Sequence, residues 1–398
     1  MWMGIFDSLK NLFNGKKKTA PCRAVPMELS QEEMQKLDEQ MYQANMEKKK
    51  YILYRKEKTP VGELWRIVAC KNFVNETPSY GKQEIKVGRL GGLVQSEDNL
   101  SHENNCWIDY DVIVCDDAKV SFNAYAEGNV IISDSAVVTN CAHLIGCQKS
   151  EKKSKSEFGN STQTAGSNSV QISFGNVTIN GKNVSVNGEI VDDDTPLRVC
   201  GKSKVIDCAV LKDHACVSGE SMVVGEALIE GHACVKGRSI VAGNAKMHDN
   251  VTIQDGSGIA EFAEASGNAV IKGCSQLRNN AKISGNGTIS EGAGAFDFAR
   301  IADNAQVSGN VRLDDNAVVC GNAVMSGFAK ASEKAVVKDN AVVTNNATIR
   351  GFSVIEGNVV VKDNADVFGS SRISGNAVLK GNAKLMNRKV CGNECVWH

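Results

Sequence analysis

The sequence predicts an all-β fold, a triangular parallel β-helix built from coils of 18 residues, and two regularities predict it. From Ala209 to Ala383 a small residue recurs at every sixth position over 30 consecutive hexads, as 20 Ala, 6 Ser, 3 Val and 1 Gly. Two places after each small residue stands Leu, Ile, Val or Met in 27 hexads and Ala in the other three. Because side chains alternate along a strand, a hexad fits one short strand and one corner, and three hexads close a coil.

Two 18-residue recurrences support three hexads per coil. Four Ser residues replace Ala at steps of 18, as expected if they stack in successive coils: Ser221, Ser239, Ser257 and Ser275. A five-residue motif also recurs 18 positions later, first as Asp213-His214-Ala215-Cys216-Val217 and then as Gly231-His232-Ala233-Cys234-Val235. We therefore expect aliphatic side chains to fill a prism and the small residues to lie where its walls crowd.

The corners carry turn signals of their own. Two places before the small residues stand 16 Gly, 9 Asp, 3 Glu and 2 Asn, and the next position is Asn in 15 of the 30 hexads. Gly and Asn tolerate positive φ, and Asp and Asn bond their own backbone, so each of these pairs predicts a turn.

The main β-helix is expected over residues 201–398 and its first coils over 106–146. In these first coils the small residues also recur every six positions, but out of register with those of the main β-helix. An insertion of non-repeat length must separate the two phases, and residues 147–200 fit. In this inserted loop, Val177 and Ile179 alternate up to Asn180-Gly181, and Val184 and Val186 follow it. That pattern predicts a short hairpin.

Two further segments are expected before the coils. Residues 51–105 form a small β entry segment, in which Tyr51 to Arg55 pairs with Trp65 to Cys70 around the turn Thr59-Pro60-Val61-Gly62. Residues 19–50 form a linker and a charged helix that starts at Ser30, with Glu33 as its capping-box partner. Met34, Leu37 and Met41 share one side of this helix. We expect a solvated linker helix, and pairing with a copy of itself or with the first helix is the alternative.

Residues 1–18 predict an amphipathic helix with a basic tail. Its apolar face and the lysines behind it are Ile5, Phe6, Leu9, Leu12, Phe13, Lys16, Lys17 and Lys18. Such a helix suits an anionic membrane surface or a protein partner, and packing on the open N-terminal end of the rod is the alternative. Asp7, Lys10 and Asn11 break the apolar run, so the segment is not a signal peptide.

Composition limits the partners. With 45 basic and 46 acidic residues the net charge is −1, and no basic stripe follows the repeats, so we expect no nucleic-acid partner. No apolar stretch approaches the roughly 18 residues of a spanning helix. Fourteen Cys without a secretion signal indicate a reducing cytoplasm. We expect a cytoplasmic protein with protein partners or self-association, peripheral at the inner face of the membrane if the N-terminal helix binds lipid.

The repeat resembles the hexapeptide-repeat superfamily of left-handed parallel β-helices, best known from acyltransferases. Left-handedness comes from this resemblance, because parallel crossovers are ordinarily right-handed. The Gly or Asp stands one place later than is usual there, as in Val217-Ser218-Gly219. Three upstream motifs are similar to uncharacterised bacterial proteins of the YdcK type, whose acyltransferase label rests on the fold. These motifs are Gly88-Arg89-Leu90-Gly91-Gly92-Leu93-Val94, Asn99-Leu100-Ser101 and Cys106-Trp107-Ile108-Asp109.

The resemblance makes histidines the catalytic candidates, because a His is the base of hexapeptide acyltransferases. The available ones are His143, His214, His232 and His248. His214 and His232 should stack with Cys216 and Cys234 along one face, where a soft metal would need a further ligand. The structural alternative is that both histidines replace the corner Asn in neighbouring coils.

Three C-terminal residues, Cys391, Cys395 and His398, have a spacing loosely like a zinc half-site. The register instead places Cys395 in the small column and Trp397 in the aliphatic column. We therefore expect no metal there and a Trp397 side chain that plugs the last coil. Phe262, Phe298 and Phe352 should share one corner, as a stack or as an interaction stripe.

Two classes of function compete. The favoured one is a non-enzymatic β-solenoid scaffold without a cofactor, recruited by its N-terminal helix to a membrane or to a bacterial or prophage-derived assembly. The alternative, implied by the resemblance, is an acyl-CoA-dependent acyltransferase, which is normally a trimeric oligomer. The shifted Gly/Asp position and the lack of a compelling catalytic cluster favour the scaffold.

Overall fold

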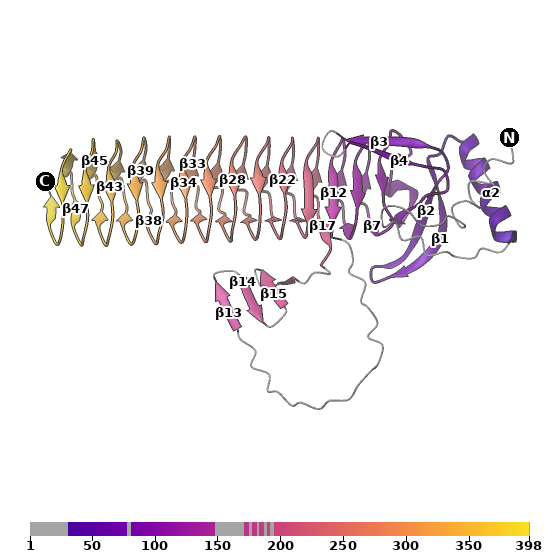
Figure 1. Cartoon of the computed structure of the whole chain (residues 1–398), viewed down its shortest axis with the longest axis horizontal. Helices are drawn as coiled ribbons and strands as arrows, with labels where there is room; N and C mark the ends of the chain where they lie inside the picture. The colour runs from indigo at the N-terminus through magenta and orange to yellow at the C-terminus, as the bar shows by residue number, and fades with distance from the viewer. Residues whose placement is uncertain are drawn as a thin grey trace, which may run out of the picture.

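The computed structural model describes residues 31–77, 81–147, 171–174, 177–180, 183–186, 189–191 and 195–397. Their repeated part is a long parallel β-solenoid, seen from the side in Figure 1, whose coils are triangular because each contributes a strand to three sheets. Its three walls belong to sheets of 17, 14 and 13 strands in the described residues. The predicted fold class is confirmed, and so is the step of 18, since each strand pairs with the third one along, as Met222 with Ile240 and Val223 with Val241.

The strands of the rod are short and regularly spaced. From β20 (Cys216–Val217) to β44 (Val360–Val361) each has two residues, and a new one begins every six positions. Before this run lie β6 (Trp107–Ile108), β7 (Val112–Val114), β8 (Lys119–Val120), β9 (Tyr125–Glu127), β10 (Val130–Ile132), β11 (Val137–Val138), β12 (His143–Gly146), β17 (Leu197–Val199), β18 (Lys204–Val205) and β19 (Val210–Asp213). After it lie β45 (Asp366–Phe368), β46 (Arg372–Ile373), β47 (Val378–Lys380), β48 (Lys384–Met386), β49 (Lys389–Val390) and β50 (Cys395–Trp397).

The two residue columns read from the sequence form the core. Inward residues such as Val235 and Val343, and small residues such as Ala215 and Ala341, have no exposed surface. Where Ser stands in the small column its hydroxyl is buried, and the Ser221 hydroxyl donates to the Ser218 carbonyl at 2.8 Å. A small side chain is needed because the coil bends there, and a hydroxyl fits because the corner itself supplies an acceptor.

The corners adopt the turn conformation that their residues predict. Gly219 has φ 78°, and a Cβ there would lie 2.8 Å from the Gly237 carbonyl oxygen, so the stacked backbones exclude a side chain. Asp249 has φ 58°, and its carboxylate accepts a 2.8 Å bond from the Gly267 amide one coil further on. Asp therefore offsets the cost of positive φ by bonding to the next coil.

One corner carries a continuous ladder of amide side chains. Each Asn donates from Nδ2 to Oδ1 of the Asn in the next coil, at 2.8 to 3.1 Å. The ladder consists of Asn250, Asn268, Asn286, Asn304, Asn322, Asn340, Asn358, Asn376 and Asn393. Such in-register amide bonds polarise one another and favour a single stacking register.

The N-terminal end of the rod is closed by the entry segment. Strands β1 (Tyr51–Thr59) and β2 (Gly62–Ala69) form the predicted antiparallel pair, and β5 (Leu90–Val94) joins them to β7. A second hairpin, β3 (Phe73–Thr77) and β4 (Gly81–Ile85), was not predicted, and a short 3-10 helix covers Glu97–Asn99. Buried residues such as Ile67 and Val94 continue the core of the coils, so the open prism end is covered.

The charged helix is α2 (Gln31–Met46), and the expectation that it is a solvated linker is wrong. Leu37, Met41 and Ala44 are buried against Ile52, Val68 and Cys70 of the entry segment. The apolar spacing was read correctly, but the helix uses it to pack on the entry sheet at the end of the molecule (Figure 1).

The insertion leaves the rod after β12 and returns before β17. Across it the pairing offset rises from 18 to 67, as between Gly146 and Asp213, so it adds 49 residues (67 minus 18). Leu197–Val199 already belongs to the rod, so the insertion ends earlier than the expected residue 200. The predicted hairpin is formed by β14 (Val177–Asn180) and β15 (Asn183–Val186), flanked by β13 (Gln171–Phe174) and β16 (Glu189–Val191) in one antiparallel sheet.

The last coil departs from the predicted register. It is one residue short, so Ile373 pairs with Val390 and Leu379 with Val396 at an offset of 17. Val396 therefore takes the inward place, and Trp397, opposite Lys380, is 66% exposed. The expectation that Trp397 plugs the prism is wrong, because counting by sixes cannot detect a coil that lacks one corner residue.

Candidate functional site

The point where the insertion joins the rod brings predicted and unpredicted residues together. His214 and His232 lie at the same corner of adjacent coils, and their rings stack at 4.6 Å between centroids with 7° between planes. One coil earlier Cys147 occupies the equivalent corner, and its Sγ lies 3.4 Å from His214 Nε2. The Asn ladder begins in the coil after His232. The histidines thus continue the corner of the Asn ladder, and His214 also contacts a thiol.

The other nitrogen of His214 fixes the protonation of the ring. Nδ1 lies 2.6 Å from the Thr195 carbonyl oxygen, which can only accept a hydrogen bond, so Nδ1 carries the proton. In the neutral ring Nε2 is then the acceptor, and it faces the Cys147 thiol. A thiol, an imidazole acceptor and an orienting group are the parts of a cysteine nucleophile with its base.

His143 lies elsewhere, on the wall that contains β6, β9 and β12. It is buried, with Nε2 3.1 Å from Glu127 Oε1 and its ring edge-on to Tyr125 at 5.2 Å. The Tyr125 hydroxyl donates to Asp109 at 2.7 Å, and Arg89 donates to the same carboxylate at 2.8 Å. Burial raises the pKa of Asp109, while Arg89 and the Tyr125 hydroxyl oppose that rise. The arrangement gives His143 an acidic partner but buries it.

His248 is partly buried. Its Nδ1 lies 2.7 Å from Glu230, whose carboxylate also approaches Lys212 at 3.7 Å. The structure therefore separates the four histidine candidates into a stacked pair beside Cys147, a buried residue and a partly buried ion pair.

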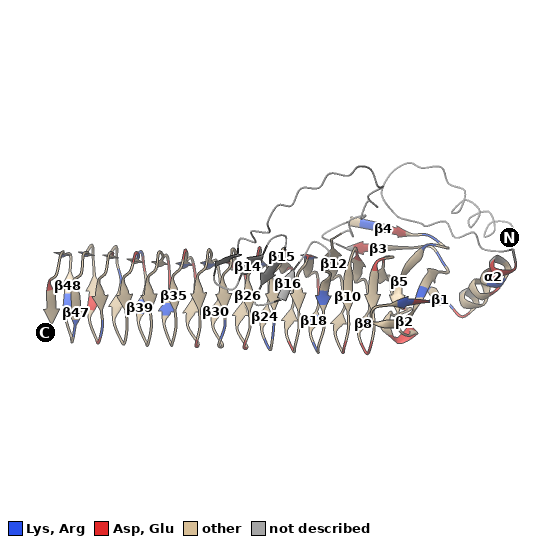
Figure 2. Ribbon diagram, turned by 90° about the horizontal axis from the view of Figure 1, so that it is seen from below, with Lys and Arg blue, Asp and Glu red and all other residues tan. Residues whose placement is uncertain are grey.

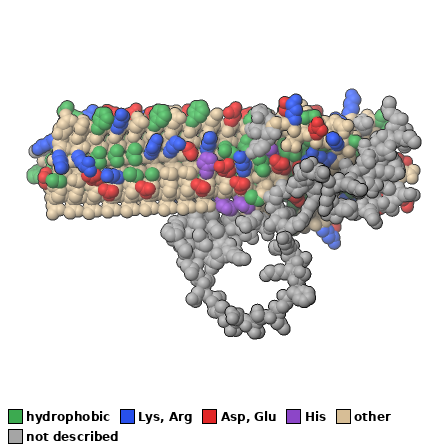
Figure 3. Space-filling view, viewed as in Figure 1, with side chains coloured by type: hydrophobic (Ala, Val, Ile, Leu, Met, Phe, Trp, Pro, Cys, Tyr) green, Lys and Arg blue, Asp and Glu red, His purple; other side chains and the backbone are tan. Residues whose placement is uncertain are grey.

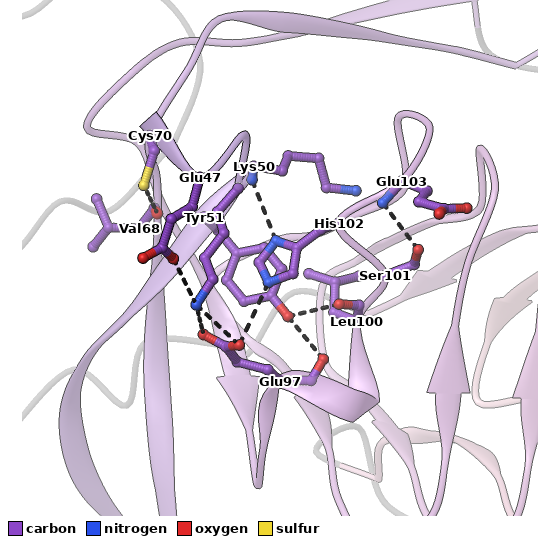
Figure 4. A network of polar contacts seen from close by, with 11 residues as sticks. Glu47, Lys50, Tyr51, Val68, Cys70, Glu97, Leu100, Ser101, His102 and Glu103 are labelled. Carbon is purple, nitrogen blue, oxygen red and sulfur yellow. Dashed lines mark hydrogen bonds and ion pairs between the residues drawn. The ribbon is translucent and has the colours of Figure 1, made fainter. Parts of the chain in front are cut away.

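A second polar cluster, unpredicted, joins the entry segment to the first coils (Figure 4). The Tyr51 hydroxyl donates to the Leu100 carbonyl at 2.6 Å, and its ring stacks on His102 at 4.2 Å. His102 Nδ1 accepts from the Lys50 amide at 3.2 Å, and burial lowers the pKa of this His. The buried Lys50 ammonium donates to Cys106 Sγ at 3.1 Å, and burial lowers the pKa of that Lys. These buried contacts hold the entry segment on the rod.

The described residues contain no cluster of three or more ligands able to hold a metal ion. Cys391 and Cys395 are exposed, and His398 lies outside the described residues. The proposed contact residues of the N-terminal segment, 1–18, lie outside them as well. Across the described residues no helix is long and apolar enough to span a membrane.

The outer surface of the rod carries apolar rows and mixed charge. Phe262, Phe298 and Phe352 share one corner and are 63%, 55% and 62% exposed. They lie two and three coils apart, about 10 and 14 Å, so their rings do not stack on one another. Apolar side chains form short rows between charged ones, and basic and acidic residues are interspersed along the rod (Figures 2 and 3). This surface offers apolar contacts at fixed spacing.

Neither comparison with known proteins found a relative. No protein-family model matches the sequence, and no curated protein is similar to it. Within the part of the chain that it describes, the structure establishes a parallel β-solenoid of 18-residue coils with one α-helix and a small antiparallel segment at its N-terminal end.

Proposed function

We propose that this chain is a non-enzymatic β-solenoid scaffold that presents binding residues at fixed distances along a rigid rod. The observation that carries this proposal is the regularity of the rod itself: an unbroken buried core and an Asn ladder that runs from Asn250 to Asn393. Each coil is tied to its neighbours by the same contacts, so spacing between outward side chains is fixed by about 4.8 Å per coil.

The exposed residues are the basis for the partner-binding surfaces that we propose. The corner row of Phe262, Phe298 and Phe352 suits apolar contacts with a protein partner or a second copy of the chain. Recruitment to an anionic membrane surface, at the inner face of the cytoplasmic membrane, is assigned to Ile5, Phe6, Leu9, Leu12, Phe13, Lys16, Lys17 and Lys18.

The membrane part is tested by deletion of residues 1–18. Co-sedimentation with vesicles of mixed neutral and anionic lipid should be lost, while circular dichroism and the melting transition of the rod stay unchanged. A fivefold mutant of the apolar face to Ser, with the lysines kept, is the matched variant and should also lose binding. If vesicle binding survived both changes, the proposed membrane recruitment would be wrong, and the proposed scaffold function would be unaffected.

The second candidate is an acyl-CoA-dependent acyltransferase of the hexapeptide-repeat type, as in the YdcK-type proteins that the sequence resembles. The observation in its favour is His143, whose Nε2 lies 3.1 Å from Glu127 as a base held by a carboxylate would. Titration calorimetry with coenzyme A, which has no acyl group to transfer, separates the two functions. The scaffold proposal expects no saturable binding, and saturable binding that His143→Ala abolishes would replace it with the transferase.

A further inference from the structure

The two ends of the insertion meet at a single corner of the rod. The offset of 67 places Cys147 at the coil position of His214, and the offset of 18 places Pro196 at that same position. Asn129 holds both ends, since its amide donates to the Cys147 carbonyl at 3.1 Å and its carbonyl accepts from the Leu197 amide at 3.0 Å. Cys147 is therefore fixed by the backbone of the rod, although the insertion follows it in sequence.

We propose that Cys147 is a nucleophilic thiol activated by His214, and that it accepts acyl groups from thioesters. The Sγ to Nε2 distance of 3.4 Å is within hydrogen-bond range for sulfur, and the Thr195 carbonyl at Nδ1 keeps Nε2 as the acceptor. Both side chains are only partly buried, so the sulfur is not sealed in the core. The site is independent of the scaffold function, which stands or falls by other measurements.

The imidazole is held on its face and at one edge. His232 stacks on its face at 4.6 Å, and Thr195 holds its Nδ1 edge. The His214 backbone is fixed as well, because its amide donates to the Gly231 carbonyl at 3.0 Å and the neighbouring Asp213 carboxylate accepts from the Gly231 amide at 3.0 Å. A base fixed in this way needs no rearrangement before it takes the thiol proton.

The reaction that this pair supports is thiol–thioester exchange. The Cys147 thiol gives its proton to His214 Nε2 as the sulfur attacks the carbonyl carbon of the thioester. The bond from that carbon to the leaving sulfur then breaks, and the leaving thiolate takes the proton back from Nε2. The products are an S-acyl Cys147 and a free thiol, so no oxidant, metal or water is consumed.

A thioester is favoured over an amide by the two groups that the described residues place at this corner. A thiolate leaves readily, so a single base that returns its proton is sufficient. Amide cleavage makes a poor leaving group and depends on several fixed donors for the oxyanion, each contributing about 3 kcal/mol. The contacts at this corner provide one thiol and one base, which fits the less demanding reaction.

The test is acylation of the full chain by the acetyl thioester of N-acetylcysteamine, mapped to single cysteines by tandem mass spectrometry. Cys216 and Cys234, partly buried in the next two coils, are internal controls in the same molecule. We expect Cys147 to be acetylated at least tenfold faster than either of them, and Cys147→Ser to abolish this fast phase.

The base is tested by His214→Asn, which installs the residue that the later coils carry at this corner. We expect acylation of Cys147 to slow by a factor of ten to a hundred or more, with an unchanged melting transition. His248→Asn is the matched control, because it removes an imidazole that pairs with Glu230 and leaves the contact of His214 with Cys147 in place, and it should change the rate by less than threefold. Acylation of Cys147 no faster than that of Cys216 and Cys234 in the unmodified chain, or a rate unaffected by His214→Asn, would overturn the proposal.

Discussion

The repeated rod from Lys204 to Leu385 and the N-terminal end of the molecule, which is the entry segment at residues 51–105 with its contacts to Lys50 and the first coils, bury different kinds of residues. In the rod the core is aliphatic or small, and the buried polar side chains are mostly Ser, of which Ser221, Ser275 and Ser371 donate to a carbonyl of their own corner. At the entry segment Lys50, Arg66 and Asn99 are each almost fully buried, and their side chains make single contacts outside the repeat pattern. A repeated interaction can be read from periodicity, whereas these single polar contacts depend on residues up to 56 positions apart, as between Lys50 and Cys106.

The comparison also predicts how far the destabilising effect of a substitution extends in each region. Coils of the rod contact only their neighbours, so stability there is close to a sum of similar terms. The entry segment has few interchangeable contacts, so one lost partner leaves several groups unsatisfied.

The largest expected effect is from a charge in the rod core. Val343 has no exposed surface, so Val343→Asp buries an unpaired carboxylate and should lower the free energy of unfolding by about 4 kcal/mol or more. The outward control, Lys236→Asp, should change it by less than about 0.5 kcal/mol. Thermal and urea melts measure both.

Hydrogen exchange sharpens this prediction. Amides of β41 (Val342–Val343) and of the coils next to it should lose protection in Val343→Asp, while those of β22 (Leu228–Ile229), six coils away, keep it. Equal and mild effects of the inward and outward changes would mean that the register assigned to the rod is wrong.

A smaller loss is expected from an amide in the entry segment. Asn99 is 1% exposed, and its side chain bonds to four backbone groups, those of Gln95, Ser96, Asp116 and Ala118. Asn99→Ala leaves them without a partner and should cost about 2–4 kcal/mol. Asn322→Ala, in the exposed Asn ladder, should cost less than about 1 kcal/mol because water replaces its partners. Chemical denaturation compares the two, and a costlier Asn322 would mean that the ladder is cooperative beyond its pairwise bonds.

This contrast explains what the sequence could predict. The hexads predicted the solenoid and the stacking of Ser221 on Ser239, and apolar alternation around Asn180-Gly181 predicted the hairpin, because each depends on short-range spacing. Helix α2 was found but its packing was missed, since spacing shows an apolar face and not what covers it. Cys147 was missed for a related reason: its partner His214 lies 67 positions away, and only the structure gives the length of the insertion.

The entry segment should also respond to acid. Burial alone raises the pKa of Glu57, but its bonds to Arg66 and then to Arg55 outweigh burial and hold the pKa below its usual 4.5. The ionised Glu57 carboxylate therefore stabilises the fold fully at pH values above the usual pKa. This stabilisation is lost as the pH falls through the lower pKa that Glu57 has in the folded protein. Glu57→Gln should cost about 1–2 kcal/mol at pH 7, and this difference from the unmodified protein should shrink by pH 3.

Urea melts at the two pH values measure this difference. Glu63→Gln, at an exposed position of the same hairpin, should cost less than about 0.5 kcal/mol at either pH. A loss for Glu57→Gln that is as large at pH 3 as at pH 7 would mean that Glu57 acts through packing and not through its charge.

The smallest expected change in stability comes from the largest change in sequence. Removal of residues 148–196 joins Cys147 to Leu197 and restores the offset of 18, because both Cys147 and Pro196 occupy the coil position of His214. The free energy of unfolding of the rod should stay within about 1 kcal/mol of that of the full chain, because a longer segment between the same two chain ends adds little closure entropy. Removal of residues 147–196 is the matched control. It shifts β17 by one residue, which turns its inward side chains outward and should destabilise the adjoining coils strongly.

If both deletions were equally harmless, the register across the insertion would be wrong. If both unfolded the rod, the inserted residues would belong to its core. The shorter deletion also removes Thr195, so it should slow acylation of Cys147 while stability is kept, which separates what the insertion does for the thiol from what the coils do for the fold.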